Sequence, residues 1–286
     1  MENELKKHIE SSLGLKITSL VPVSGGDIST ALKITAGTDQ FFCKYQAGDM
    51  GYSMLKAEND GLEAIAATGF IKTPRAIHLS KMESGGCLLL EYIESKGAGE
   101  KDMVQLGRQL AGLHTAKAAS FGWDTDNYIG SLSQYNTRAD NWAGFYTSSR
   151  LLPQLKMAHD KDLLSKRDVP PADKIEMRLH DICSPCEPSL IHGDLWGGNF
   201  LIAKNGSPYL IDPGVSYSHP GMDIAMSRLF GGFSSSFYHA YEEASDRPLP
   251  SQAEIELYQL YYLLVHLNIF GSSYASSVRD IVKRYF

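Results

Sequence analysis

The first third of the chain alternates between short apolar runs and clusters of turn-forming residues. The apolar runs predict strands at residues 17–23, 30–35, 40–45, 76–79 and 87–90. The segments between them are rich in Gly, Ser, Asp and Thr, which favour turns. Two stretches, residues 5–13 and 50–68, instead carry the apolar spacing of a helix. Residues 1–92 are therefore expected to form a small antiparallel sheet with helices.

Beyond a short Gly-containing stretch, the pattern becomes mainly helical. The spacing predicts helices at residues 102–115, 142–155, 173–182, 223–230, 235–244 and 254–270. The only clear strand pair expected here joins residues 200–202 to 209–211 through Asn205-Gly206, a favourable hairpin turn. We expect an α+β protein with a sheet lobe at residues 1–92, a hinge near 92, and a helical lobe at residues 93–286.

The composition is ordinary for a folded protein, since 43% of the 286 residues are hydrophobic and 21% are charged. A net charge of −6 gives no electrostatic footprint for nucleic acid or an anionic membrane. No apolar stretch reaches the ~20 residues of a membrane helix. The charged N-terminal residues lack the apolar core of a signal peptide, and four cysteines are too few for a disulfide framework. We expect a reduced, cytoplasmic, globular protein whose oligomeric state the sequence leaves open.

The densest chemical signal is residues 191–199, which read Ile-His-Gly-Asp-Leu-Trp-Gly-Gly-Asn. His192, Asp194 and Asn199 have the order and spacing of the kinase catalytic loop, His-Arg-Asp-Leu-x-x-x-Asn. The expected hairpin then leads to Asp212, at the spacing where kinases place a metal-binding Asp.

Phosphoryl transfer asks a protein for positioning and charge neutralisation rather than covalent help. One carboxylate orients and deprotonates the attacking hydroxyl, while an amide and a second carboxylate hold Mg²⁺ against the phosphates. A tight loop carries Asp194 and Asn199, and the returning hairpin is expected to bring Asp212 to face them. The sequence therefore predicts a MgATP site in a cleft between the two lobes.

The first lobe offers a lysine for the nucleotide phosphates. Lys44 lies on the third expected strand; taken alone, it reads more simply as a solubilising charge on an edge strand. Glu58, on the following helix, is a candidate to hold this lysine in place, as a helix glutamate does in kinases. Glu63 is a rival partner that spacing alone does not exclude.

Two backbone segments are further candidates for nucleotide binding. Gly25 and Gly26 lie in a turn whose N–H groups could cover phosphates, although the same residues suit a plain hairpin turn. Glu91, Tyr92 and Ile93 follow an apolar strand and resemble the kinase segment whose backbone pairs with adenine. An apolar edge of the core would give the same pattern.

Longer stretches resemble the fructosamine kinase (ketosamine-3-kinase) family. They are residues 25–29, 54–58, 113–114, 126–130, 134–136, 192–199, 211–213, 223–233 and 261–266. The resemblance runs nearly end to end, and the loop with Trp196 is its most specific element. This family is related to aminoglycoside and choline kinases, so the resemblance implies the two-lobe protein-kinase-like fold.

The resemblance implies ATP-dependent phosphorylation of the O3 hydroxyl of a ketoamine, the product of an amine and a sugar. The substrate would be a small molecule or a glycated protein, and phosphorylation would let the amine be recovered. By the same resemblance Asp194 is the proton acceptor, Asn199 and Asp212 hold Mg²⁺, and Lys44 with Glu58 places the phosphates of ATP.

Three more residues acquire expected roles from the resemblance. Trp196 either faces the sugar or packs under its own loop, and His266 either approaches the substrate or is a hydrogen-bonded core histidine. Asp223 is expected to be a buried carboxylate that braces the backbone of the catalytic loop.

Two rival functions remain open from the sequence. One is a kinase of the same fold acting on an aminoglycoside or a choline-like alcohol, and the other is a catalytically silent nucleotide-binding protein. Cys183 and Cys186 form a Cys-x-x-Cys, but neither zinc-ligand spacing nor a thioredoxin-like context accompanies them, so we expect a loop there.

Overall fold

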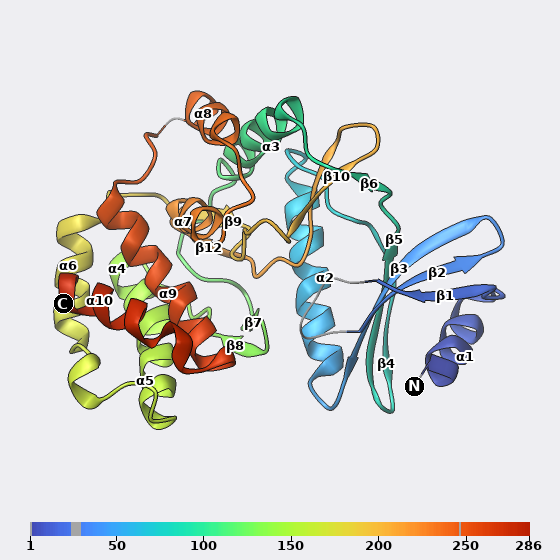
Figure 1. Ribbon diagram of the computed structural model, residues 1–286, viewed down its shortest axis with the longest axis horizontal. Helices are drawn as coiled ribbons and strands as arrows, with labels where there is room; N and C mark the ends of the chain where they lie inside the picture. Colours follow the sequence, from blue (N-terminus) through green and yellow to red (C-terminus); the bar gives the residue numbers. More distant parts are fainter. Residues whose placement is uncertain (1, 24–29, 246) are drawn as a thin grey trace. The chain divides into compact units, whose positions relative to one another are not determined.

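The computed structural model describes residues 2–23, 30–245 and 247–286, and contacts between residues divide the chain into two units (Figure 1). The first unit comprises Met1–Ala98 and Leu201–Asp212, and the second comprises Gly99–Phe200 and Pro213–Phe286.

The first unit is built on an antiparallel five-stranded sheet with the order β1-β2-β3-β5-β4. Its strands are β1 (Ser19–Pro22), β2 (Thr30–Ala36), β3 (Asp39–Ala47), β4 (Ala76–Met82) and β5 (Gly85–Glu91). The pattern of apolar runs predicted these five strands near their observed positions, because each run is bounded by turn residues.

Helices cover both faces of this sheet. Helix α1 (Glu2–Leu13) packs on one face, and α2 (Gly51–Ala67) lies along the other (Figure 1). Successive residues of β5 alternate between the two cores: Cys87 and Leu89 join the α1 side, and Leu88 and Leu90 join the α2 side. This explains why residues 87–90 of the strand are apolar at every position.

A hairpin distant in sequence completes the first unit. Strands β10 (Phe200–Ala203) and β11 (Pro208–Leu210) form a sheet with β6 (Ser95–Lys96) in the order β11-β10-β6. The N–H of Leu210 also donates to the carbonyl of Lys72 at 2.9 Å. From the sequence this hairpin was expected within residues 93–286, whereas its contacts assign it to the first unit. The backbone bonds that decide this are long-range pairings that no local pattern encodes.

The second unit is mainly helical. Its α-helices are α3 (Glu100–Leu113), α4 (Trp142–Tyr146), α5 (Leu152–Asp160), α6 (Ala172–Ile182), α7 (Gly221–Leu229), α8 (Ser235–Ala244), α9 (Gln252–Phe270) and α10 (Ala275–Tyr285). Helix α9 is apolar on almost every side and lies against α5, α7 and α10, as expected of a central helix. None of the described helices has the length and apolar character needed to span a membrane.

Three features of this unit differ from the sequence expectation. Two short strand pairs that were not predicted are present: β7 (Asn127–Ile129) with β8 (Leu132–Gln134), and β9 (Ser189–Ile191) with β12 (Ser216–Ser218). Strands of three residues are too short to show a period. The helix predicted at 142–155 contains a π-helical turn, Thr147–Leu151, and α10 was not predicted.

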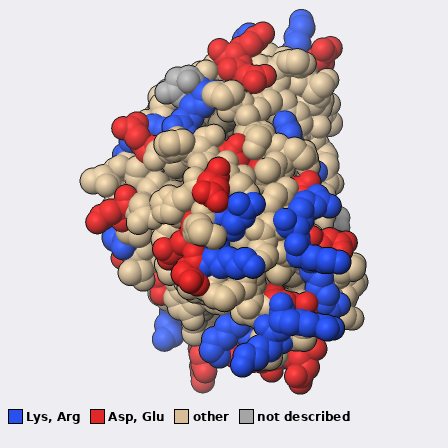
Figure 2. Space-filling view, turned by 90° about the vertical axis from the view of Figure 1, so that its left-hand side faces the viewer, with Lys and Arg blue, Asp and Glu red and all other residues tan. Residues whose placement is uncertain are grey.

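The face shown in Figure 2 carries charges of both signs, with Asp and Glu side chains lying among the Lys and Arg side chains. Ion pairs of the second unit include Arg178 with Asp181 at 3.1 Å and Arg279 with Asp168 at 3.4 Å. Mixed charge of this kind is typical of a solvated protein surface.

Candidate active site

In the first unit Lys44 lies between two carboxylates. Its register partner on β5 is Leu88, so its side chain lies on the face of the sheet that α2 covers. Its Nζ donates to Oε1 of Glu58 on α2 at 2.8 Å and also pairs with Oδ1 of Asp212, which follows β11. Glu63 accepts a hydrogen bond from Asn59 and is exposed. The structure therefore brings together Lys44, Glu58 and Asp212, three residues proposed from the sequence.

Burial and charge act in opposite directions on this cluster. Burial alone would lower the pKa of Lys44, but the charges of Asp212 and Glu58 outweigh it and hold that pKa above its ordinary value. Burial raises the pKa of Glu58 to about 7, against the opposing influence of Lys44. Lys44 therefore stays a cation throughout the neutral pH range, as a phosphate-binding group requires.

In the second unit the loop of residues 192–199 is braced by a fully buried carboxylate. One oxygen of Asp223 on α7 accepts the N–H of His192 at 2.8 Å, and the other accepts the N–H of Gly193 at 2.8 Å. His114 contacts the first oxygen at 3.1 Å. Burial would raise the pKa of Asp223, but these bonds hold it below its usual range. Asp223 thus has the bracing position expected from the sequence.

The loop holds Asp194 and Asn199 together. Asn199 Nδ2 donates to the backbone carbonyl of Asp194 at 2.8 Å and to its Oδ2 at 3.2 Å. Because its amide nitrogen is committed to Asp194, the Oδ1 of Asn199 is left as the acceptor end of the side chain. Asp194 itself is half-buried, and Asn199 is buried.

Gly193 allows the closest backbone approach in this loop. It has a φ of 86°, and a Cβ there would lie 2.1 Å from the carbonyl oxygen of Gly214. The N–H of Gly214 donates in turn to the carbonyl of His192 at 2.9 Å. Any side chain at position 193 would therefore separate the loop from the segment that follows Asp212.

The two expected substrate residues take different positions. Trp196 is 41% exposed, and a Cβ on Gly198 would lie 2.3 Å from its Cη2, so the ring lies over its own loop and keeps an open face. His266 on α9 is half-buried, and its Nδ1 lies 2.8 Å from the carbonyl of Tyr262, whose hydroxyl donates to the carbonyl of Gly193 at 3.0 Å. Their roles toward a substrate stay predictions.

The expected nucleotide-binding backbone is described only in part. Glu91 closes β5 opposite Phe41, and Tyr92 and Ile93 follow it as half-buried residues. The ammonium of Lys33 lies 4.2 Å from the centre of the Tyr92 ring. Gly25 and Gly26 lie outside the described residues.

Sequence reasoning missed a buried polar network next to the loop. Arg150, in the π-helical turn, is 2% exposed. Its guanidinium donates to Oδ1 of Asn136 at 2.8 Å and to Oγ of Ser216 at 3.2 Å. Ser216 pairs with Ile191, the residue immediately before the loop. The network therefore connects a buried cation to the strand that delivers the loop.

The same network ties β8 to the segment after Asp212. Gln134 Nε2 donates to the carbonyl of Gly214 at 3.1 Å and to Oδ1 of Asn127 at 2.9 Å, while Tyr261 donates to Gln134 Oε1 at 2.7 Å. The sequence signal that could have revealed this network is the pair of amide side chains at positions 134 and 136. Both are buried, one in β8 and the other just after it.

Cys183 and Cys186 lie in the loop after α6, as expected, and both are half-buried. Burial raises the pKa of each thiol to about 12, so both stay protonated at neutral pH.

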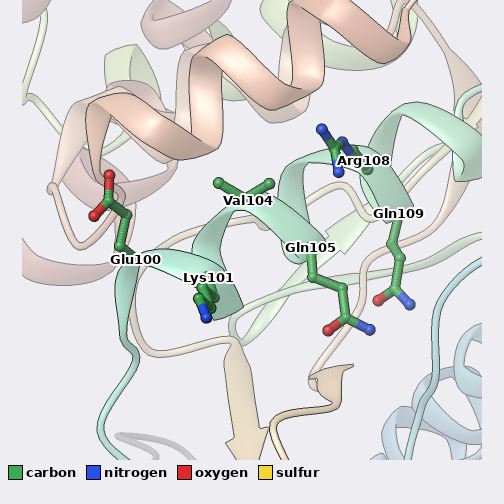
Figure 3. Close-up of a pocket in the computed structure, with 6 residues that line it drawn as sticks. All are labelled: Glu100, Lys101, Val104, Gln105, Arg108 and Gln109. Atoms are coloured by element: carbon green, nitrogen blue, oxygen red, sulfur yellow. The ribbon is translucent and has the colours of Figure 1, made fainter.

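A shallow hollow of about 450 Å³ runs along α3, and Figure 3 shows the side chains that line it. They are Glu100, Lys101, Val104, Gln105, Arg108 and Gln109. Gln105 and Gln109 extend to the same side of the helix. None of the residues predicted from the loop or the Lys44 cluster lines this hollow, so it is not part of the candidate site.

Comparison with known proteins shows the family of the chain. The whole chain, residues 1–286, matches the family model described as fructosamine kinase. A "Probable ketoamine kinase" of Lactiplantibacillus plantarum is 37% identical over 271 residues, covering 94% of this chain and 95% of that protein. The chloroplastic protein-ribulosamine 3-kinase of Arabidopsis thaliana is 35% identical over 277 residues, covering 94% of this chain and 83% of that protein.

Solved structures show the same fold. A Haemophilus somnus protein assigned as a fructosamine-3-kinase superposes with a TM-score of 0.87 at 24% identity, covering 100% of this chain and 98% of that one. A variant of aminoglycoside phosphotransferase APH(4)-Ia, in ternary complex with ADP and hygromycin B, has a TM-score of 0.64 at 14% identity, covering 99% and 98%. This protein has the α+β, protein-kinase-like fold of these phosphotransferases, and it belongs to the fructosamine kinase family.

Proposed function

We propose that this protein is an ATP-dependent kinase that phosphorylates the O3 hydroxyl of a ketoamine, such as a fructosamine or ribulosamine, in the repair of glycated amines or proteins. The observation that carries the proposal is the loop in which Asp194 is tied to Asn199 and braced through Asp223. Family membership and the names of the relatives support the choice of substrate. A cytoplasmic location is part of the proposal.

The residues present fit a magnesium nucleotide. Among the described residues, no group of three or more His, Cys, Asp and Glu side chains could hold a metal unaided. Mg²⁺ is commonly held by one or two protein oxygens together with phosphates and water. The amide nitrogen of Asn199 is bonded to Asp194, so its Oδ1 is available as a ligand. Asp212 offers a carboxylate oxygen, and its side chain is 36% exposed. Structures of the same fold that contain ADP or AMP-PNP support ATP as the donor.

Each proposed role follows from the contacts of one side chain. Asp194 would orient the attacking hydroxyl and accept its proton. Lys44 would neutralise phosphate charge, and Glu58 fixes its ammonium at 2.8 Å. Bound Mg²⁺ would offset the negative charge that the phosphates carry. Asn199 and Asp212 are the proposed ligands of that ion.

Binding roles complete the proposal. The backbone of Glu91, Tyr92 and Ile93 would pair with adenine, and the N–H groups of Gly25 and Gly26 would contact phosphates. Trp196 offers its open face to the sugar, since apolar C–H edges of a sugar ring pack well on an aromatic face, and His266 would approach the substrate from α9.

The test is product analysis by phosphorus and carbon NMR with MgATP and fructosyl- and ribosyl-derived lysine ketoamines, an aminoglycoside and an amino alcohol. We expect phosphate on O3 of a ketoamine. Asp194→Asn should lower kcat by roughly 10²- to 10⁴-fold, the usual range for a lost general base, with nucleotide affinity unchanged. Asp181→Asn, at an exposed ion pair of α6, is the matched control and should retain full activity.

Three results would contradict the proposal. Phosphorylation of the aminoglycoside or the amino alcohol alone would favour another kinase of this fold. Nucleotide binding without turnover on any acceptor would favour a silent nucleotide-binding protein. Near-normal turnover by Asp194→Asn would remove that residue from its role.

A further inference from the structure

Four ring-bearing side chains form a partly exposed cluster on the second unit, which we call the aromatic patch: Phe230, His266, Phe270 and Tyr274. The ring centre of His266 lies 4.6 Å from that of Phe230, 5.5 Å from that of Phe270 and 5.2 Å from that of Tyr274. Phe230 is 42% exposed and Phe270 is 51% exposed. Large apolar side chains gathered in this way on a surface mark a binding site more often than scattered ones do.

The aromatic patch adjoins the loop that carries Asp194 by two routes. Through α9, His266 contacts the carbonyl of Tyr262, one helical turn away, and the Tyr262 hydroxyl contacts the carbonyl of Gly193. Through the backbone after α7, a Cβ on Gly197 would lie 3.2 Å from the carbonyl oxygen of Gly231, the residue next to Phe230. The patch therefore lies next to the backbone of this loop at Gly197.

The chemistry of His266 suits an extended, weakly polar ligand. A carbonyl oxygen can only accept, so Nδ1 carries the proton donated to Tyr262 and Nε2 is left as an acceptor. Burial lowers the pKa of His266, which keeps the ring neutral at physiological pH. The patch thus offers apolar ring faces and one hydrogen-bond acceptor.

A ketoamine has two ends, and the proposed function places only one of them. The sugar end has to lie at Asp194 for its hydroxyl to react, so the amine-derived substituent extends away from that carboxylate. We propose that the aromatic patch binds this substituent, and specifically the aliphatic stem of a modified lysine, through the faces of Phe230, Phe270 and Tyr274. The inference rests on the proposed function and adds the specificity of its amine side.

The experiment compares two ketoamines that share one sugar and differ in the amine, methylamine or an Nα-blocked lysine modified at Nε. The protein and its Phe230→Ala and Phe270→Ala variants are assayed for kcat and KM on both ketoamines. The buried part of a four-carbon stem gives an expected preference of about tenfold in kcat/KM for the lysine adduct. Each variant should lose most of that preference through KM, while its kinetics on the methylamine adduct stay within about twofold of wild type.

Two further variants make the test specific. Phe270→Leu keeps apolar surface and should retain most of the preference, because burial of the aliphatic stem supplies it. Phe70→Ala removes a Phe that is 45% exposed in the first unit, and it should leave kcat/KM unchanged on both adducts.

If the Phe230→Ala and Phe270→Ala variants lose kcat/KM equally on both adducts, or change it on neither, the inference is overturned. The proposed function would stay intact in both cases. Failure of wild-type protein to phosphorylate both adducts would overturn the proposed function, and the inference with it.

Discussion

Lys44 and Glu58 form a buried ion pair across two elements of the first unit, with 2.8 Å between Nζ and Oε1. The side chains are 7% and 15% exposed, so water screens their interaction poorly. Asp212 shares the same ammonium. Removing the cation would leave two carboxylates close together without a counter-charge.

We therefore expect Lys44→Met to lower the free energy of unfolding by about 3 kcal/mol, in the range measured for a buried pair that loses one partner. Urea unfolding measures this change. Lys56→Met is the control, because Lys56 pairs with Asp60 on the surface of the same helix at 2.5 Å, and its loss should cost about 0.5 kcal/mol. Equal costs for the two variants would show that the Lys44 cluster is not effectively buried.

Gly193→Ala should disrupt the loop. The added Cβ would approach the carbonyl of Gly214 to 2.1 Å, so the two backbone segments have to separate. A displacement of this size near reacting groups typically costs roughly 100-fold in rate, which steady-state kinetics would detect.

Gly69→Ala separates this effect from backbone strain. Gly69 has a φ of 72°, and its Cβ would meet no heavy atom within 4 Å. That variant should lose about 1–2 kcal/mol of stability, the cost of a left-handed conformation, and keep its rate. If Gly193→Ala kept its rate as well, the close approach to Gly214 would not matter for activity.

Arg150→Met should weaken the second unit by roughly 2 to 4 kcal/mol, because it strips charged donors from Asn136, Ser216 and the carbonyl of Tyr135. Amide hydrogen exchange provides a local readout, and we expect faster exchange at Gly193 and Gly214 than at the core of α9. Lys156→Met, at an exposed ion pair of α5, should change neither the stability nor the local exchange rates. Uniformly faster exchange throughout the unit would instead indicate a purely global loss of stability.

His219 should make stability depend on pH. Its side chain is 4% exposed, and its Nδ1 accepts the N–H of Gly221 at 2.9 Å. Burial lowers the pKa of His219 to about 4. Between about pH 6.5 and 4 the unfolded chain therefore binds a proton that the folded chain does not, so stability falls as the pH falls through that window.

The full effect of this histidine amounts to about 3 kcal/mol, lost progressively from neutral pH to pH 4. His219→Asn keeps an acceptor for Gly221 but has no titrating group. Urea unfolding from pH 7 to 4 should give a flatter curve for the variant than for the wild type. Parallel curves would remove His219 as the source of the acid sensitivity.

The sequence by itself determined the kinds of element and the chemistry of the loop. Strand and helix periods depend on residues two to four positions apart, so the strands of the five-stranded sheet and the apolar α9 could be predicted from local pattern. The spacing of His192, Asp194 and Asn199 likewise lies within one loop. A hydrogen bond between Asn199 and Asp194 is a short-range contact that this spacing favours.

Tertiary structure decided the partners. It selected Glu58 over Glu63 for Lys44, joined the β10–β11 hairpin to the first unit, and placed Arg150 inside the network beside the loop. These outcomes depend on strand register and on packing between residues 14 or more positions apart. The local period of a strand or helix carries no information about which distant segment packs on its apolar face. Burial, charge pairing and the aromatic patch all depend on that packing.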